Sequence, residues 1–121
     1  MKVIIAGSRD IADMSKVEAA IRHSKFKITE VVGGGCSGVD RLGWRWAVDN
    51  KIPFTLFKAN WNRYGKYAGP IRNREMACYA DALIAVWDGK SRGTRSMLNE
   101  AAEKGLKVYL ARVKELNTCL V

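Results

Sequence analysis

The sequence predicts an α/β protein: a single domain with a mostly parallel five-stranded sheet and helices on both faces. Short apolar runs alternate with segments whose apolar residues recur at helical spacing, which is typical of parallel sheets built by right-handed crossovers. Several of the apolar runs end in glycine-containing loops. The length of 121 residues suits one domain, which we expect to cover residues 1–121, with residues 112–121 as a C-terminal tail.

The strands are predicted from their apolar runs. Residues 3–6 form an uninterrupted apolar run that ends at Gly7, as expected of a strand buried on both faces. Residues 82–87 form the most apolar run of the chain. By the same criterion we expect three further strands, at residues 29–33, 53–57 and 106–111.

Helical spacing predicts four helices between these strands. The first covers residues 14–24, with Asp13 or Ser15 as its N-cap. The second, at residues 37–51, follows a cluster of glycines. The third and fourth are expected at residues 71–79, with Pro70 in the first turn, and at residues 94–104, ended by Gly105. Residues 58–69 are expected to form a long loop.

Three of the predicted strands end in glycine-containing loops, at Gly7, at Gly33 and after Asp88. Glycine lets backbone N–H groups approach a ligand, and the N-terminus of a following helix attracts anions. Because the carboxyl ends of parallel strands share one edge of a sheet, we expect the three loops to share a phosphate-bearing ligand. The candidate ligand-binding residues in these loops are Gly7, Ser8, Arg9, Gly34, Gly35, Cys36, Ser37, Gly38, Gly89 and Gly93.

Two residues near the glycine cluster allow more than one interpretation. Asp40 lies one turn into the second predicted helix, where it could accept a hydrogen bond from a ribose hydroxyl or simply complement the helix dipole. Cys36 could have a reactive thiol near a helix N-terminus, or it could be a small residue that fills the loop. No histidine partner is expected beside Cys36, because the single histidine, His23, is expected at the end of the first helix.

The loops lack two common nucleotide-binding signatures. No Walker A sequence G-x-x-x-x-G-K-[ST] occurs, and no loop combines G-x-G-x-x-G with the acidic residue that the dinucleotide fingerprint requires further on. The sequence therefore gives no support to ATP hydrolysis by a P-loop or to hydride transfer. We expect no cofactor.

The formal net charge of +9 favours phosphate-bearing or polyanionic partners. Lys and Arg are scattered rather than gathered in blocks, so nucleic-acid binding is a secondary expectation. It is supported by Trp61 and Tyr64, which lie in a polar segment and are candidates for stacking on bases.

The sequence gives little evidence for a metal site or for association with a membrane. The three cysteines lack C-x-x-C spacing and the chain has one histidine, so we expect no metal site and a reducing, cytoplasmic setting. The first seven residues are too few to span a bilayer and lack the features of a signal peptide. No membrane partner is expected.

The chain resembles the SLOG superfamily, and most closely its small YspA-like branch. The resemblance is carried by AGSRD, VVGGGCSGVDRLGWRWA, KANWNRYGKYAGPIRNREM and ADALIAVWDGKSRGTRSMLNEAAEKGL, which together span about residues 3–110. It implies a Rossmann-like domain that binds a nucleotide-derived ligand. The superfamily includes the lonely-guy enzymes, which release a base from a nucleoside 5′-monophosphate. It also includes the DNA-processing protein A group, which binds single-stranded DNA, and sensor domains of bacterial conflict systems.

The lonely-guy pattern pairs an arginine, nine residues before an Ala-Asp, with a later G-G-x-G-T-x-x-E. Here Arg72 precedes Asp81 by nine residues, Met76 falls at the matching methionine, and Gly93 and Thr94 match the Gly-Thr. The resemblance therefore implies that four residues contact the ligand: Arg72, its neighbour Asn73, Gly93 and Thr94.

The same comparison leaves catalysis in question. Met97 takes the place of the family glutamate, and the loop before Gly93 is two residues longer than in the pattern. Release of a base would then need another carboxylate, acting beside Arg72 as a catalytic residue. The candidates are Asp40, Asp88 and Glu100, with Glu75 as a further alternative.

Three functions stay open at this point. The leading interpretation is a domain that binds a nucleotide or a nucleotide-derived signal, with Trp61 contributing to the site. The alternatives are an N-glycosidic hydrolase or transferase acting on nucleoside monophosphates, and binding of single-stranded nucleic acid. The resemblance also suggests a homo-oligomer, with Trp44 and Trp46 as contact residues, and a role in a phage or a bacterial conflict system.

Overall fold

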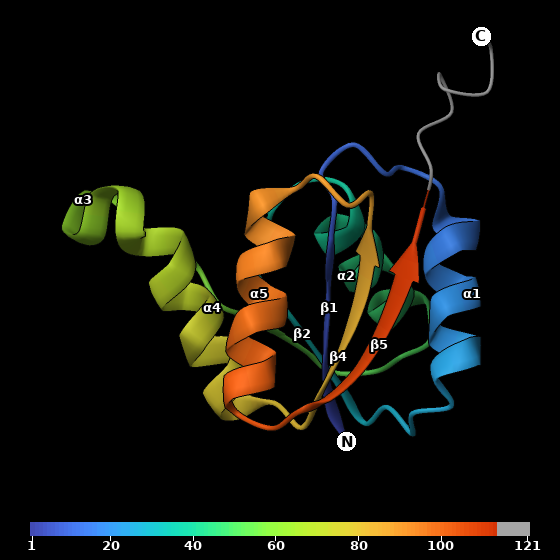
Figure 1. Cartoon of the computed structure of the whole chain (residues 1–121). Coiled ribbons are helices and arrows are strands. Elements are labelled where there is room, and N and C mark those ends of the chain that lie inside the picture. The colour runs from blue at the N-terminus through green and yellow to red at the C-terminus, as the bar shows by residue number, and fades with distance from the viewer. Residues whose placement is uncertain (114–121) are drawn as a thin grey trace, which may run out of the picture.

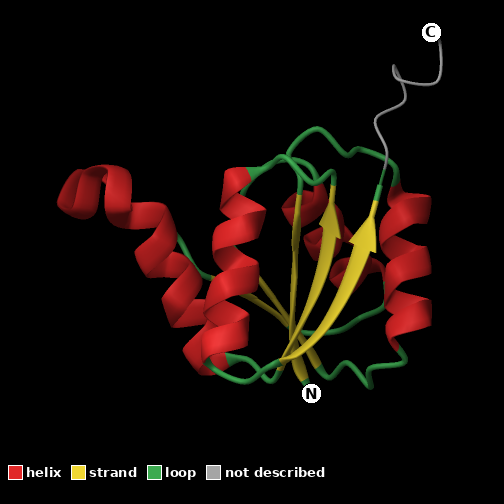
Figure 2. Cartoon of the chain, in the orientation of Figure 1, coloured by secondary structure: helices red, strands yellow, loops and turns green. Residues whose placement is uncertain are grey.

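The computed structural model describes residues 1–113, in which strands and helices alternate along the chain (Figures 1 and 2). The strands are β1 (Lys2–Gly7), β2 (Glu30–Gly33), β3 (Phe54–Leu56), β4 (Ala82–Trp87) and β5 (Lys107–Arg112). The helices are α1 (Met14–Ser24), α2 (Val39–Asp49), α3 (Trp61–Tyr64), the 3-10 helix η1 (Gly65–Tyr67), α4 (Ala68–Tyr79) and α5 (Arg92–Glu103). The predicted Rossmann-like α/β fold is confirmed.

The five strands form one sheet in the order β3-β2-β1-β4-β5, and every neighbouring pair is parallel. Val3 of β1 pairs with Val31 on one side and with Ala82 on the other. The chain moves outward from β1 to β3 and then returns to the other side of β1 for β4 and β5. Strand order therefore reverses between β1 and β4, and ligands of open parallel sheets bind outside the strand ends at such a reversal.

Neighbouring residues of the central strand face two separate cores. Val3 and Ile5 belong to the core that lies against α1 and α2, whereas Ile4 and Ala6 belong to the core against α4 and α5. Figure 1 shows the two pairs of helices on opposite faces of the sheet. Because both faces are covered, the strand needs apolar side chains at every position, which is why the run at residues 3–6 is unbroken.

The expectation of a long loop at residues 58–69 is wrong, because α3 and η1 occupy most of it. The Asn60 side chain caps α3 by accepting a hydrogen bond from the backbone N–H of Arg63 at 3.1 Å. Gly65, with φ +54°, follows α3 and begins η1. The two short helices continue from α4 away from the body of the sheet (Figure 1).

The other differences concern the ends of elements. Helix α2 begins two residues later than predicted because Gly38 has a non-helical backbone, with φ 73° and ψ −131°. Helix α5 begins two residues earlier, because the hydroxyl of Ser91 accepts from the N–H of Thr94 and caps it. Strand β5 includes Arg112, and the rest of the expected tail from residue 114, with Cys119, lies outside the described residues. No helix in residues 1–113 combines the length and apolarity needed to cross a bilayer.

Candidate ligand-binding site

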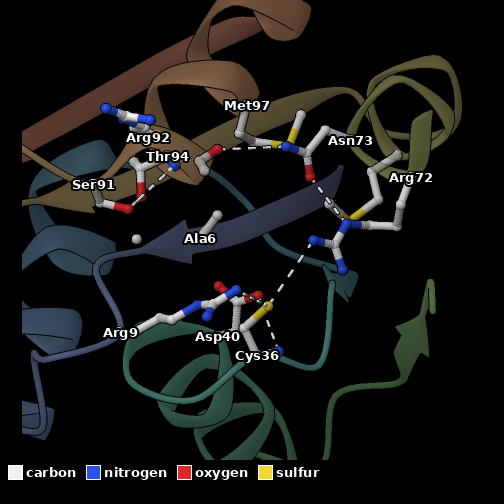
Figure 3. A pocket seen from close by; sticks show the side chains of 13 residues that line it. Ala6, Arg9, Cys36, Asp40, Arg72, Asn73, Ser91, Arg92, Thr94 and Met97 are labelled. Atoms are coloured by element: carbon white, nitrogen blue, oxygen red, sulfur yellow. Dashed lines mark hydrogen bonds between the residues drawn. The ribbon is translucent and has the colours of Figure 1, made fainter. Parts of the chain in front are cut away.

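A cavity of about 320 Å³ lies at the carboxyl end of the sheet, beside the reversal of strand order (Figure 3). Its walls come from the end of β1 and the loop after it, the loop after β2, and helices α2, α4 and α5. The lining residues are Ala6, Gly7, Arg9, Cys36, Asp40, Arg72, Asn73, Met76, Ser91, Arg92, Gly93, Thr94 and Met97. The three glycine-containing loops that the sequence singles out thus meet at one cavity.

Ser8 holds these loops together. Its backbone N–H donates to the oxygen of Val86 at 3.1 Å, and its backbone oxygen accepts from the N–H of Val39 at 3.2 Å. Its hydroxyl accepts from the N–H of Asp88 at 2.9 Å. Ser8 is buried, so these bonds are shielded from water and fix the ends of β1 and β4 against the start of α2.

Gly38 allows the loop after β2 to approach the loop after β1. Its φ of +73° lies in the region that favours glycine, and a Cβ atom there would collide with the backbone oxygens of Ser8 and Arg9. Gly38 is therefore needed for the close approach of two backbones, whether or not a ligand is bound.

Arg72 brings a buried cation from α4 to the glycine cluster. Its Nη1 donates to the backbone oxygen of Gly34 at 2.7 Å, and its Nε donates to Oδ1 of Asn73 at 3.0 Å. Its Nη2 lies 4.0 Å from Sγ of Cys36 (Figure 3). Two of the guanidinium nitrogens are thus held by the protein while the group lines the cavity.

Among the described residues, Asp40 is the one acidic residue that lines the cavity. It is buried at the start of α2, and one oxygen accepts a weak hydrogen bond from the N–H of Cys36 at 3.4 Å. Burial raises the pKa of Asp40, while the N–H of Cys36 and the charge of Arg72 act in the opposite direction. A carboxyl group in this state can hold or release a proton inside the cavity.

The charges around the cavity favour an anion. Arg9, Arg72 and Arg92 line it together with the single carboxylate of Asp40. The first turn of α5 contributes Gly93 and Thr94, and a helix N-terminus adds a partial positive charge. Within residues 1–113, no three His, Cys, Asp or Glu side chains gather closely enough to hold a metal ion.

Comparison with known proteins identifies the family. The model of the YspA, cpYpsA-related SLOG family matches residues 1–64, more than half of the chain. The chain belongs to this SLOG family. It is also 35% identical over 117 residues to the gene 61 protein of Mycobacterium phage D29, a match that covers 88% of this chain and 93% of that protein. The resemblance predicted from the motifs is confirmed.

The structure of DNA processing protein A (DprA) from Streptococcus pneumoniae has a similar fold. The TM-score is 0.76 and the match covers 96% of this chain at 20% sequence identity. The chain spans only about half of that protein, 52% of its length. At this identity the likeness shows the SLOG fold alone.

In this SLOG-family chain, most of the predicted ligand residues lie around the cavity or next to it. Gly34 lies beneath the guanidinium of Arg72, whereas Gly35 and Ser37 line a groove beside the cavity. Ser8, Gly38 and Gly89 are not among the lining residues of the described chain. The predicted residues that do line the cavity are Gly7, Arg9, Cys36, Asp40, Arg72, Asn73, Gly93 and Thr94.

Other predicted residues lie elsewhere. The side chain of Asp88 accepts from the backbone N–H groups of Lys90 at 2.7 Å and Ser91 at 2.9 Å, and these bonds lower its pKa. Glu100 forms an ion pair with Arg74 at 3.4 Å. Neither carboxylate is among the cavity-lining residues of the described chain. Trp61 and Glu75 are likewise outside that set and exposed.

Five lining residues were not among the ligand residues predicted from the sequence: Ala6, Met76, Ser91, Arg92 and Met97. Arg92 was detectable, because it is a cation in the glycine-bounded segment DGKSRG that precedes a helix. The glycine cluster also contains the spacing G-x-G-x-x-G at Gly33, Gly35 and Gly38, but no acidic residue occurs in residues 50–74 to complete the fingerprint. Met97, at the place of the family glutamate, is buried in the cavity wall.

Proposed function

We propose that the chain binds a nucleotide or a nucleotide-derived ligand in this cavity. The observation that carries the proposal is the meeting of three glycine-containing loops and three arginines at the reversal of strand order. The net charge of +9 supports it by drawing anions toward the molecule. The expected homo-oligomer and cytoplasmic setting stay predictions.

The phosphate group of the ligand would lie against Arg72 and the start of α5. Nη1 and Nε of Arg72 are bonded to Gly34 and Asn73, which orients the guanidinium, so phosphate would be bound mainly by the N–H donors of Nη2. The backbone N–H groups of Arg92 and Gly93, the first residues of α5, would add donors of the kind that helix N-termini offer to phosphate, while the N–H of Thr94 is bonded to the hydroxyl of Ser91. Pre-oriented donors reduce the entropy cost of binding.

Isothermal titration calorimetry tests this proposal. The chain is titrated with AMP, CMP, ADP-ribose and cyclic ADP-ribose isomers, and at least one is expected to give a saturable signal. Arg72→Lys should weaken that binding, whereas Arg74→Lys, on the same helix but outside the cavity lining, should not. Flat titrations for the wild-type chain with every ligand would contradict the proposal. Mass analysis of any ligand released by heating the purified protein would identify the natural one.

A second candidate function is cleavage of the N-glycosidic bond of a nucleoside monophosphate. It is favoured by Asp40, a buried carboxyl group with a raised pKa that lines the cavity. In this reaction the Asp40 carboxyl would donate its proton to the departing base, while water adds its oxygen to C1′ of the ribose and returns a proton to the carboxylate. The products would be the free base and ribose 5-phosphate.

Chromatography of AMP, CMP and deoxynucleoside monophosphates after incubation with the protein tests this candidate. Free base should appear with the wild-type chain and not with Asp40→Asn, which keeps a hydrogen-bond acceptor but has no proton to transfer. Glu100→Gln is the matched control, because Glu100 lies outside the cavity lining. Nucleotide that stays intact over long incubation would exclude the reaction.

Binding of single-stranded nucleic acid is favoured by a different part of the molecule, residues 58–67, which we call the aromatic arm. Trp61, Tyr64 and Tyr67 are exposed there, and cations lie over two of the rings, Arg63 at 5.2 Å and Lys66 at 5.3 Å from the ring centroids. No acidic residue occurs in residues 50–74. Exposed rings among basic residues suit stacking on bases beside a phosphate backbone.

This candidate predicts that labelled oligonucleotides bind with an affinity that falls steeply with salt concentration. Trp61→Ala with Tyr67→Ala should weaken this binding without affecting titrations with small nucleotides. Val48→Ala, exposed on another helix, is the control. Oligonucleotides that migrate unretarded at low salt would exclude the candidate.

A further inference from the structure

A second hollow, which we call the ring groove, lies next to the charged cavity. Its volume is about 530 Å³, and it runs between α2 and the edge strand β3. Its apolar wall includes Trp44 of α2 and Phe54 and Leu56 of β3. Trp44 and Leu56 are 47% and 44% exposed, so large apolar side chains face solvent on both sides of the groove.

The groove adjoins the charged cavity described above. Cys36 and Asp40 line both hollows. Asp40 and Trp44 are four residues apart on α2, so their side chains lie on the same face of the helix, one turn apart. A ligand that leaves the cavity past Asp40 therefore reaches Trp44 next.

The exposure of Trp44 is not a requirement of the fold. Trp46, two residues further along α2, packs against the core beneath that helix, whereas Trp44 points to the groove. Arg41, which also lines the groove, adds a planar guanidinium near the indole. Aromatic rings and guanidinium planes are the surfaces on which proteins stack nucleobases.

We propose that the ring groove takes the heterocyclic base of a nucleoside phosphate whose phosphate group occupies the charged cavity. This inference rests on the proposed function and narrows the ligand to one with an anionic end and a planar end. The ribose would cross between the two hollows at Cys36 and Asp40. The base would stack on Trp44, with Leu56 on the opposite wall of the groove.

Paired calorimetric titrations with AMP and ribose 5-phosphate test the inference, because the two ligands share a sugar phosphate and differ by the base. Wild-type protein should bind AMP more tightly. Trp44→Ala should weaken AMP binding roughly 5- to 150-fold, the range for loss of one stacked base, and leave ribose 5-phosphate within about twofold. Arg72→Lys should weaken both ligands. Val48→Ala, exposed on α2 but outside the groove lining, should change neither.

The outcomes separate the inference from the function on which it rests. If both ligands bind the wild-type chain but Trp44→Ala leaves AMP binding unchanged, the ring groove is overturned and the phosphate site stands. If neither ligand binds, the proposed function fails first. If Trp44→Ala weakens both ligands equally and shifts the sedimentation coefficient, the surface is an interface between copies and the inference is overturned. Leu56→Ala, on β3, repeats the test should Trp44→Ala not fold.

Discussion

Nη1 of Arg72 donates a hydrogen bond of 2.7 Å to the backbone oxygen of Gly34, which joins helix α4 to the glycine cluster after β2. The bond is buried, so removing the arginine takes away this partner of the Gly34 oxygen. Nε of the same guanidinium donates to Asn73, whose amide nitrogen lies 3.4 Å from the backbone oxygen of Gly93. Arg72 and Asn73 together thus link the loop after β2 to the start of α5.

Arg72→Lys should therefore lower stability as well as ligand affinity. Lysine keeps the charge but cannot place donors on Gly34 and Asn73 at once. Loss of a buried, charge-assisted hydrogen bond costs about 1.5–3 kcal/mol, which urea unfolding would measure. Arg74→Lys, at an exposed ion pair on the same helix, should change the free energy of unfolding by less than about 0.5 kcal/mol. Equal midpoints for the two variants would contradict the structural role of Arg72.

Gly38→Ala should destabilise the protein more than Gly105→Ala does. Both glycines have a positive φ, of +73° and +70°. The left-handed α conformation costs an alanine about 1–2 kcal/mol. Gly38 has a ψ of −131°, outside that region, so the backbone cost of an alanine is higher there. At Gly38 the added Cβ also collides with the backbone oxygens of Ser8 and Arg9, whereas at Gly105 no atom of the described residues lies within 4 Å.

Thermal or urea unfolding of the two glycine variants measures the extra cost at Gly38, which combines its backbone conformation with the collision against Ser8 and Arg9. Gly38→Ala should also weaken ligand binding, since it pushes apart two loops of the cavity. Similar losses of stability for both variants would show that the two loops separate at little cost.

Strands β1 and β4 were predictable from the sequence because their side chains are buried on both faces. Val3, Ile4 and Ile5 have no exposed surface, so the apolar run is continuous and needs no knowledge of the partner strands. Helix α3 was missed because none of its side chains is buried. A helix without a buried face leaves no periodic apolar pattern in the sequence.

The ligand-binding site was only partly predictable, because the sequence shows where the loops lie but not where their side chains point. Glycines after strands mark the edge of the sheet where a ligand binds, and that expectation requires only the parallel topology. Spacing does not tell which carboxylate faces the cavity. Asp88 turns back onto its own loop, while Asp40 faces inward from the first turn of α2. Arg72 came from the family resemblance, because a buried arginine within a helix gives no signal of its own.

Asp40→Asn should change how stability depends on pH. Burial raises the pKa of Asp40 in the folded chain above its ordinary value of about 4. The folded state therefore binds the Asp40 proton more tightly than the unfolded state does. The protonated Asp40 carboxyl contributes its whole stabilisation at pH values below the pKa of the unfolded chain, and this stabilisation is lost as pH rises through the pKa of the folded chain. Asparagine does not ionise, so the variant should gain stability relative to wild type as pH rises upward from about 4.

Urea unfolding of wild type and Asp40→Asn at a series of pH values measures this difference. Asp10→Asn, at an exposed residue outside the cavity lining, serves as the control and should follow the wild-type profile. Parallel profiles for wild type and Asp40→Asn would contradict the raised pKa.

Alkylation of Cys36 should block ligand binding. Its Sγ lines the cavity, 4.0 Å from Nη2 of Arg9 and 4.0 Å from Nη2 of Arg72, so a carbamidomethyl group there would occupy the space between the two cations. The experiment uses the double variant Cys78→Ser, Cys119→Ser, in which Cys36 is the one cysteine left to react. Intact mass gives the extent of alkylation and calorimetry gives the loss of binding.

The rate of alkylation gives a second readout. A ligand added before the reagent should slow the alkylation of Cys36. Adding Cys36→Ser to that background provides a control whose ligand binding the reagent should not change. Full ligand affinity after complete alkylation would place the ligand outside this cavity.

Tyr79→Phe should lower stability at neutral pH and have less effect in acid. The Tyr79 hydroxyl donates a hydrogen bond to Oε2 of Glu30, which also accepts from Oγ1 of Thr55 at 2.8 Å. The bond from Tyr79 lowers the pKa of Glu30 below its ordinary value of about 4.3. A depressed folded pKa contributes stability that is present above the unfolded pKa and is lost as pH falls through the folded pKa.

We therefore expect Tyr79→Phe to cost about 1 kcal/mol near pH 7, a value at the low end for a charged acceptor because the group is partly exposed. The cost should shrink as pH falls below about 4, where Glu30 takes up a proton. In a Glu30→Gln background the effect of Tyr79→Phe should be the same at every pH, since the acceptor no longer ionises. If Tyr79→Phe lowers stability by a pH-dependent amount in the Glu30→Gln background, Tyr79 acts on stability through another titrating group. If its effect on stability does not depend on pH in the wild-type background, the link between Tyr79 and the Glu30 carboxylate is contradicted.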